Sequence, residues 1–147
     1  MSGSARRPTR RKARRVLLQV LYEVDSTGHN LEDSLHWAFQ ETALDKKSSV
    51  FIQDLAYKVI AASKELDEII QQYATNWPIV QLSAVDRNIL RIAIYEMNMS
   101  QQVSVQIAIN EAVELAKRFG GEGTPRFVNG VLGSVAAAAS NNNMAKK

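Results

Sequence analysis

The sequence lacks cysteine altogether, contains only three prolines and seven glycines, and has no long apolar run. Without cysteine, neither a disulfide framework nor thiolate chemistry is possible, so a reducing compartment is the expected setting. A transmembrane helix needs about 18 to 20 apolar residues in succession, so the sequence predicts no transmembrane helix. Because glycine and proline are scarce, long helices are the favoured secondary structure.

The common signatures of catalysis and cofactor binding are also missing. There is no phosphate-binding loop, dinucleotide fingerprint, hydrolase elbow or zinc-protease motif. The two histidines, His29 and His36, are predicted to be exposed rather than catalytic or metal-binding. Glu111 and Glu114 are predicted to form a solvated helix face, paired with basic residues three and four positions after Glu114. We therefore predict a protein that is not an enzyme and that has no catalytic residue, cofactor or metal.

Apolar residues recur at helical spacing along almost the whole chain, which predicts an all-α, compact, single-domain bundle of about seven helices. Ser63 and Ser83 are the expected N-caps of the fourth and fifth helices. The stretch 83–86 resembles a capping box with Asp86 in place of Glu. The expected helices cover approximately residues 8–27, 31–43, 47–62, 64–76, 84–97, 105–119 and 125–139.

Positive charge is concentrated in one block near the N-terminus. Residues 5–15 read ARRPTRRKARR and hold 7 of the 18 basic residues, which leaves 11 basic against 15 acidic residues elsewhere. A basic segment on a mildly acidic body is typical of an arm that binds a polyanion. Arginine suits this role because its planar fork of donors matches a phosphate. The charge pattern leaves RNA, DNA, an anionic membrane surface or a mere solubilising tail open.

Four motifs resemble the NusB family in content, order and spacing: RRKARRVLLQVLY at 10–22, VDRNILRIAIYEM at 85–97, AINEAVELAKRFG at 108–120 and RFVNGVLG at 126–133. The resemblance implies a cytoplasmic bacterial factor of transcription antitermination. It also implies binding to boxA-type single-stranded RNA of nascent ribosomal RNA transcripts, together with the small-subunit ribosomal protein NusE. The pair then joins the antitermination complex of RNA polymerase, which reads through terminators. Some relatives form homodimers, so a homodimer stays open here.

The resemblance also suggests how the chain is divided and which residues bind RNA. Residues 10–139 are expected to form a NusB-like RNA-binding helical domain, between a flexible basic arm at 1–9 and a disordered tail at 140–147. Residues at the start of the last helix are expected beside RNA, where Phe127 either stacks on a base or packs in the core. The RNA contacts implied by the resemblance are Arg10, Arg11, Lys12, Arg14, Arg126, Phe127 and Asn129, and charge alone adds Arg6, Arg7 and Arg15.

Two further positions are implied to contact a protein partner. The acidic residue at the family position of Asp86 contacts NusE, a role that is compatible with capping the helix. Tyr22 closes the first motif, and it is either a partner-binding residue or a core tyrosine.

Two other classes of protein compete with this interpretation. One is the RNA-binding module of a ribosomal RNA methyltransferase, which is disfavoured because no cofactor-binding sheet follows the helices. The other is a helical DNA-binding regulator, which is disfavoured because no helix–turn–helix with a polar recognition helix is evident.

Overall fold

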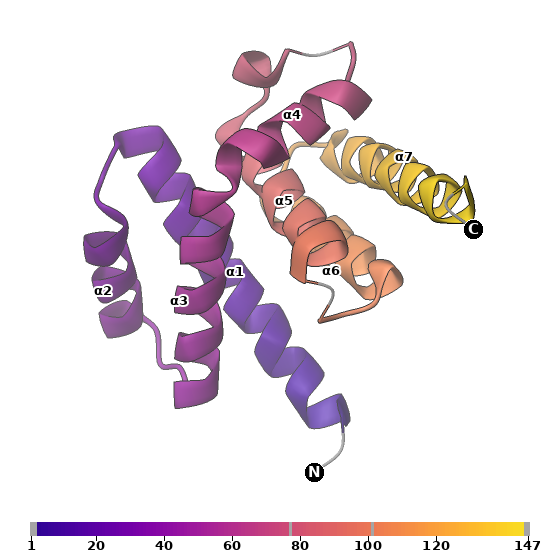
Figure 1. Ribbon diagram of the computed structural model, residues 1–147. Coiled ribbons are helices and arrows are strands. Elements are labelled where there is room, and N and C mark those ends of the chain that lie inside the picture. The colour runs from indigo at the N-terminus through magenta and orange to yellow at the C-terminus, as the bar shows by residue number, and fades with distance from the viewer. Residues whose placement is uncertain (1–2, 77, 101, 146–147) are drawn as a thin grey trace. The chain divides into compact units, whose positions relative to one another are not determined.

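The computed structural model describes residues 3–76, 78–100 and 102–145, and within the two terminal helices it describes the side chains of residues 10–141. The described backbone is helical throughout its regular parts and contains no strand, so the predicted all-α fold is confirmed (Figure 1). The elements are α1 (Gly3–Thr27), α2 (Leu31–Glu41), α3 (Lys46–Ala61), α4 (Ser63–Tyr73), η1 (Ile79–Gln81), α5 (Ala84–Ile94), η2 (Tyr95–Ser100), α6 (Val105–Phe119) and α7 (Thr124–Ala145).

The helices group into two compact units, Met1–Ala61 and Ala62–Lys147. Each unit has its own set of packed helices and is described separately below. The predicted division into an arm, one domain and a tail is a statement about independence and motion, which this grouping does not test. It stays a prediction.

In the first unit, α1 packs against both α2 and α3. Its apolar residues repeat at helical spacing, so one stripe of the helix is removed from water. The helix ends where Gly28 takes a positive φ of 74°, a backbone conformation that glycine adopts without strain. The buried apolar residues of this unit are Ala13, Val16, Leu17, Leu18, Val20, Leu21, Leu35, Ile52, Leu55, Ala56 and Val59.

The buried face of α3 does not include its largest apolar side chain. Helical spacing predicts a buried stripe through Phe51, Leu55, Val59 and Ala62, whereas Ile52 and Ala56 are buried and Phe51 and Ala62 are only half-buried. Both stripes have helical spacing, and the large aromatic ring drew the prediction one residue toward the N-terminus. As a result, Phe51 lies at the edge of the unit with part of its ring accessible.

In the second unit, α5 packs against α4, α6 and α7. Six of its eleven residues are buried, as expected for a central helix. The α-helix was predicted to continue to about residue 97, but it ends at Ile94 and continues as the π-helix η2. The buried apolar residues of these helices include Leu66, Ile70, Ile89, Leu90, Ile92, Ala93, Ile94, Ala108, Ala112, Leu115, Ala116, Val128, Leu132 and Val135.

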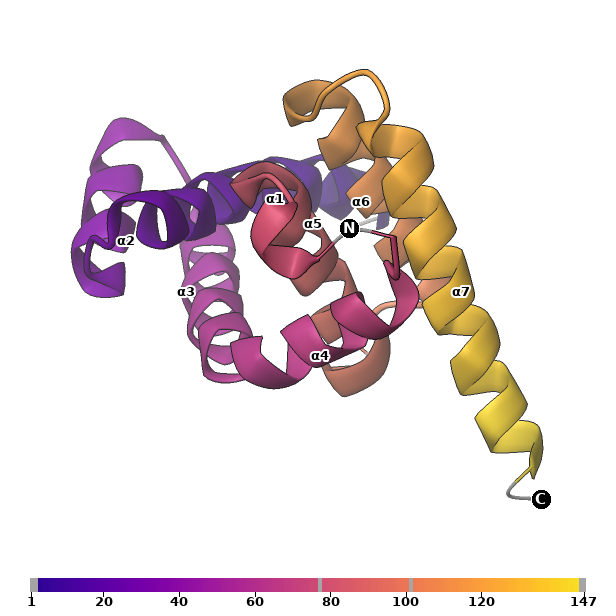
Figure 2. The ribbon, with the colours of Figure 1, turned by 90° about the horizontal axis from the view of Figure 1, so that it is seen from above.

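The terminal helices are longer than their predicted ranges. Helix α1 begins at Gly3 rather than near Pro8, and α7 continues to Ala145 rather than ending near residue 139. The last turns of α7 extend away from the other helices of their unit (Figure 2). Their polar side chains at Ser140 and Asn141 are exposed, which agrees with a segment that packs against little else. Predicted flexibility at either end concerns motion and stays a prediction.

One of the two predicted helix caps is wrong, and the predicted capping box is only half formed. Ser63 is the first residue of α4, and Ala62 precedes it as an N-cap without a side-chain hydrogen bond. Ser83 does cap α5, because its hydroxyl accepts a hydrogen bond from the Asp86 backbone N–H at 3.0 Å. The reciprocal half of the capping box is replaced, since the shorter Asp86 carboxylate accepts from Thr124 instead. Asp86 therefore ties two helices together rather than closing its own helix end.

Candidate nucleic-acid interface

The predicted RNA-binding residues of α1 form what we call the basic face, consisting of Arg10, Arg11, Lys12, Arg14 and Arg15. Lys12 is exposed, Arg10, Arg11 and Arg15 are half-buried, and Arg14 is only 4% exposed. Helix α1 carries the backbone of Arg6 and Arg7, whose side chains lie outside the described residues. Exposure thus divides the basic face into cations that a ligand can reach and one that is enclosed by the protein.

Neighbouring elements of the same unit fix the direction of these cations. The guanidinium carbon of Arg10 lies 4.0 Å from the centre of the Phe51 ring, and that of Arg14 lies 5.5 Å from it. Both are cation–π distances, worth roughly 0.5–1 kcal/mol at exposed sites. Lys12 Nζ donates a hydrogen bond to the Ala43 carbonyl at 3.0 Å. The basic face is therefore partly ordered before any ligand arrives, which reduces the entropy lost on binding.

Asp45 supports this arrangement from the start of α3. Its Oδ1 accepts a hydrogen bond from the Ser48 backbone N–H at 2.8 Å, which satisfies a free donor of the first turn. Hydrogen bonds from Ser48, with smaller contributions from the charges of Lys47 and Arg10, hold the pKa of Asp45 below its ordinary value. An ionised Asp45 thus fixes the helix that presents Phe51 to the arginines.

In the second unit, a cavity of about 320 Å³ lies where α5 and α7 begin. We call it the α5–α7 cavity. Asp86 and Phe127, which were predicted to contact two different ligands, both border it. Phe127 is half-buried, so its ring neither lies wholly in the core nor stands free in solvent. The lining consists of Gln81, Leu82, Ser83, Asp86, Gly123, Thr124 and Phe127.

Thr124 connects the two sides of this cavity. Its hydroxyl donates to Asp86 Oδ1 at 3.0 Å and accepts from the Gly121 backbone N–H at 3.0 Å. Thr124 is only 6% exposed, and a Cβ added at Gly120 would lie 2.5 Å from the Thr124 side chain. Gly120 has a φ of −88°, so its glycine is required by this close approach rather than by backbone conformation.

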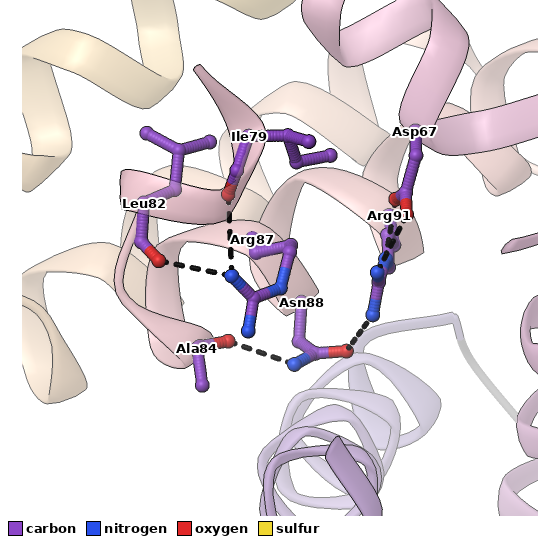
Figure 3. Close-up of polar contacts among 7 residues, drawn as sticks. All are labelled: Asp67, Ile79, Leu82, Ala84, Arg87, Asn88 and Arg91. Carbon is purple, nitrogen blue, oxygen red and sulfur yellow. Dashed lines mark hydrogen bonds and ion pairs between the residues drawn. The ribbon is translucent and has the colours of Figure 1, made fainter. Parts of the chain in front are cut away.

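Arg87 fixes the segment before α5 that contributes Leu82 to the cavity lining. Its Nη1 donates to the carbonyls of Ile79 at 3.3 Å and Leu82 at 3.0 Å, as Figure 3 shows. These carbonyls belong to η1 and the residue that follows it, so one guanidinium fixes the segment that leads into α5. Sequence reasoning missed Arg87, although an arginine in a mostly apolar helix is a signal for a buried or bridging role.

A second polar cluster links α4 to α5. Arg91 makes a two-pronged ion pair with Asp67, with N–O distances of 2.7 and 2.8 Å, and Arg91 Nη1 lies 3.3 Å from Asn88 Oδ1 (Figure 3). Asn88 in turn donates to the Ala84 carbonyl at 2.7 Å. Such forked pairs fix geometry as well as adding energy. This cluster holds the helix that carries Asp86.

The remaining predicted site residues take separate positions. Arg126 and Asn129 are exposed on the first turns of α7, outside the lining of the α5–α7 cavity. Tyr22 is 44% exposed, so the core alternative for this tyrosine is wrong. It borders a cavity of about 420 Å³ between α1 and α2, together with Trp37 and the carboxylates Glu23 and Glu41. Its predicted partner contact stays a prediction.

The acidic and histidine side chains follow the sequence analysis with one exception. His29 and His36 are exposed, as predicted, and Glu114 lies 3.9 Å from Lys117 Nζ. Glu111 is only 6% exposed, so its predicted solvated position is wrong. It shares the buried stripe of α6 with Ala108 and Leu115, three and four residues away.

Neither a metal-binding cluster nor a membrane-spanning helix is present in residues 3–76, 78–100 and 102–145. These residues contain no group of three or more His, Asp or Glu side chains that is placed to hold a metal ion. They also contain no helix with the length and apolar character that crossing a membrane requires.

These features define a class, a small all-α protein with a cationic helical face, as in helical nucleic-acid-binding proteins. Comparison with known proteins narrows the class: the model of the NusB family matches residues 11–137. The chain belongs to the NusB family. The transcription antitermination protein NusB of Dehalococcoides mccartyi is 49% identical over 130 residues, which cover 88% of this chain and 91% of that protein. The NusB of Bacillus velezensis is 41% identical over 127 residues, covering 86% and 94%.

Solved structures agree with this assignment. A crystal structure of the antitermination factors NusB and NusE in complex with double-stranded RNA matches with a TM-score of 0.82 and 26% identity, covering 90% of this chain and 98% of that one. The structure of T. maritima NusB matches with a TM-score of 0.81 and 32% identity, covering 87% and 90%. Both similarities extend over the two units of the chain.

Proposed function

We propose that this protein is a transcription antitermination factor, which binds boxA-type RNA together with NusE and helps RNA polymerase read through terminators. The observation that carries the proposal is the family match over residues 11–137, which includes most of the basic face and the whole lining of the α5–α7 cavity. The relatives are named as transcription antitermination proteins, and a similar structure contains NusB with NusE and RNA. The proposed activity is binding, without catalysis.

The basic face is proposed to supply sequence-independent affinity for RNA. Arg10, Arg11 and Lys12 are accessible in whole or in part, and each phosphate that they neutralise releases condensed counterions. Arg14 is enclosed, so we assign it to supporting the face rather than to touching the phosphates. Phosphate contacts carry no sequence information, so recognition of boxA requires other residues.

The α5–α7 cavity is proposed to supply the rest of the interaction. Its Phe127 edge and the exposed Arg126 and Asn129 beside it suit an unpaired base and its phosphate. Asp86 on the other side is proposed to bind NusE. Tyr22 is a second proposed partner contact, in the first unit, where its exposed ring lies beside carboxylates rather than cations.

The proposal is tested by the binding of fluorescently labelled RNA, measured by anisotropy at two salt concentrations. The RNAs are a single-stranded boxA sequence, a scrambled strand and a duplex of the boxA sequence, each with and without purified NusE. We expect the single-stranded boxA to bind most tightly, NusE to strengthen that binding, and salt to weaken it. Equal weak binding to all three RNAs, with or without NusE, would overturn the proposal.

The duplex is included because the similar NusB and NusE structure contains double-stranded RNA. Tighter binding to the duplex would contradict the single-stranded part of the proposal. The base-stacking role of Phe127 would then be lost, while the phosphate role of the basic face would remain.

A further inference from the structure

Two residues proposed for different ligands border a single cavity. Asp86, for NusE, lies in the first turn of α5, and Phe127, for RNA, lies in the first turn of α7. They are 41 residues apart in the sequence, and both belong to the second unit. A ligand at either residue therefore approaches the same small volume, so the connection between the two residues determines whether their ligands affect each other.

That connection is the hydroxyl group of Thr124, which donates one hydrogen bond and accepts another. Thr124 Oγ1 has one proton to donate, and it donates this proton to Asp86 Oδ1 at 3.0 Å. The same oxygen accepts the Gly121 backbone N–H at 3.0 Å. With both contacts made and the residue 6% exposed, the hydroxyl has little freedom to turn elsewhere.

The Asp86 carboxylate keeps capacity for a partner. Thr124 occupies Oδ1, while Oδ2 accepts no hydrogen bond from any residue that the structure describes. A carboxylate has about four acceptor sites, so a donor from a protein partner can bind while the Thr124 bond persists. A partner bound there would restrict the carboxylate and, through Thr124, the residue that opens α7.

We infer that Thr124 is a positioning residue that couples the NusE contact at Asp86 to the RNA surface at the start of α7. The inference rests on the proposed function and adds a mechanism by which NusE strengthens RNA binding. In that mechanism, NusE fixes the position of the Asp86 carboxylate, and the hydrogen bond from Thr124 transmits that position to the turn that carries Arg126 and Phe127. Such coupling is reciprocal, so RNA strengthens NusE binding by the same factor.

The close approach of Gly120 supports the same path. A Cβ at Gly120 would lie 2.5 Å from the Thr124 side chain, whereas one at Gly121 would lie 3.9 Å from Thr124 Oγ1, an ordinary contact. The backbone before α7 is thus built around Thr124. This difference also provides a matched pair of variants, Gly120→Ala and Gly121→Ala, that displace Thr124 or leave it in place.

The test measures a coupling factor, the ratio of the RNA dissociation constants without and with saturating NusE. Anisotropy with single-stranded boxA RNA gives this factor for the full-length protein and for T124V, which keeps the shape of the side chain but removes the hydroxyl. We expect T124V to reduce the coupling factor by about fivefold or more, within the usual range of coupling between sites. T124S, which restores the hydroxyl, is expected to retain the wild-type factor, and thermal melting checks that each variant is folded.

The glycine pair tests the position of Thr124 without changing it chemically. We expect Gly120→Ala to lower the coupling factor and Gly121→Ala to leave it near the wild-type value. An unchanged factor in T124V would overturn the inference. An equal loss in T124V and T124S would also overturn it, because the effect would then come from packing rather than from the hydroxyl.

Failure of the proposed function gives a different result. In that case the wild-type protein itself shows no selective RNA binding and no effect of NusE, before any variant is compared. Wild-type coupling that survives in every variant leaves the function in place and removes Thr124 from it.

Discussion

At the scale of single residues, like charges on one helix have different environments. Lys12 and Arg14 are two residues apart on α1, yet Lys12 is exposed and Arg14 is enclosed beside the Phe51 ring. Two steps of about 100° place their side chains on nearly opposite sides of the helix. Basic residues of one helix therefore have two roles: Lys12 places a charge in solvent, and Arg14 packs its long side chain inside the protein.

This difference predicts the effect of truncating each cation on stability. Arg14→Ala removes a buried side chain and its contact with Phe51, so we expect the free energy of unfolding to fall by about 1–3 kcal/mol. Lys12→Ala, a matched change on the exposed side, is expected to alter it by less than about 0.5 kcal/mol. Urea denaturation followed by circular dichroism measures both. Equal effects would show that the enclosure of Arg14 contributes nothing to the fold.

The sequence predicts single residues well where periodicity determines their environment, and poorly where tertiary contacts do. The repeat through Ala13, Leu17 and Val20 identifies the buried stripe of α1. No periodic signal joins Asp86 to Thr124, because tertiary packing brings together two residues that are 38 positions apart in the sequence. Burial of Glu111 and Arg14 was missed for a related reason, since a charged residue type favours exposure unless a partner is known.

At the scale of helices, boundaries and caps follow local chemistry. Helix α6 has its predicted bounds, because Ser104 caps its start and Gly120 follows its end. Helix α5 ends earlier than predicted. The prediction ran too far because the apolar spacing of the sequence continues unchanged into the π-helix η2. Sequence periodicity at this resolution does not separate these two kinds of helix.

The ion pair between α4 and α5 makes a prediction at this scale. The side chains of Arg91 and Asp67 are 14% and 28% exposed, and the pair is two-pronged. We expect Asp67→Asn to lower the free energy of unfolding by about 1–3 kcal/mol, because Arg91 keeps its charge in a partly buried place. The control is Asp54→Asn in the exposed pair with Lys58, for which about 0–0.5 kcal/mol is expected. Thermal and urea unfolding of the three proteins distinguish the two pairs.

The cap of α3 makes a prediction about pH. The pKa of Asp45 is lowered in the folded protein, chiefly by hydrogen bonds from Ser48. A lowered folded pKa contributes stability that is present above the unfolded pKa, about 3.9, and is lost as pH falls through the folded pKa. Asp45→Ala is therefore expected to lower the melting temperature at pH 7, with a difference from wild type that shrinks as pH falls below about 4. A difference that stayed constant from pH 7 to pH 3 would contradict an ionised cap.

At the scale of the whole molecule, the distribution of charge matters more than its sum. The formal net charge is +3, but outside residues 5–15 there are 11 basic and 15 acidic residues. A polyanion is therefore attracted to one segment and weakly repelled by the rest, which orients it before close contact. The acidic α2, with Glu32, Asp33 and Glu41 and no lysine or arginine, belongs to this repelling part.

This asymmetry predicts how salt affects RNA binding. Each phosphate neutralised on a single strand contributes about −0.7 to the slope of log K against log salt concentration. Replacing Arg10, Arg11 and Lys12 together by alanine removes three accessible cations, so the slope is expected to become shallower by about 2. The loss should be the same for boxA and scrambled strands, because phosphate contacts do not depend on sequence. A loss confined to boxA would instead mean that these side chains contact bases, and an unchanged slope would move the phosphate contacts to other residues.

The matched control is Lys46→Ala, Lys47→Ala and Lys58→Ala together, which removes three exposed lysines from α3. It lowers the net charge equally, so only a local role of the basic face predicts a smaller change in slope for this control.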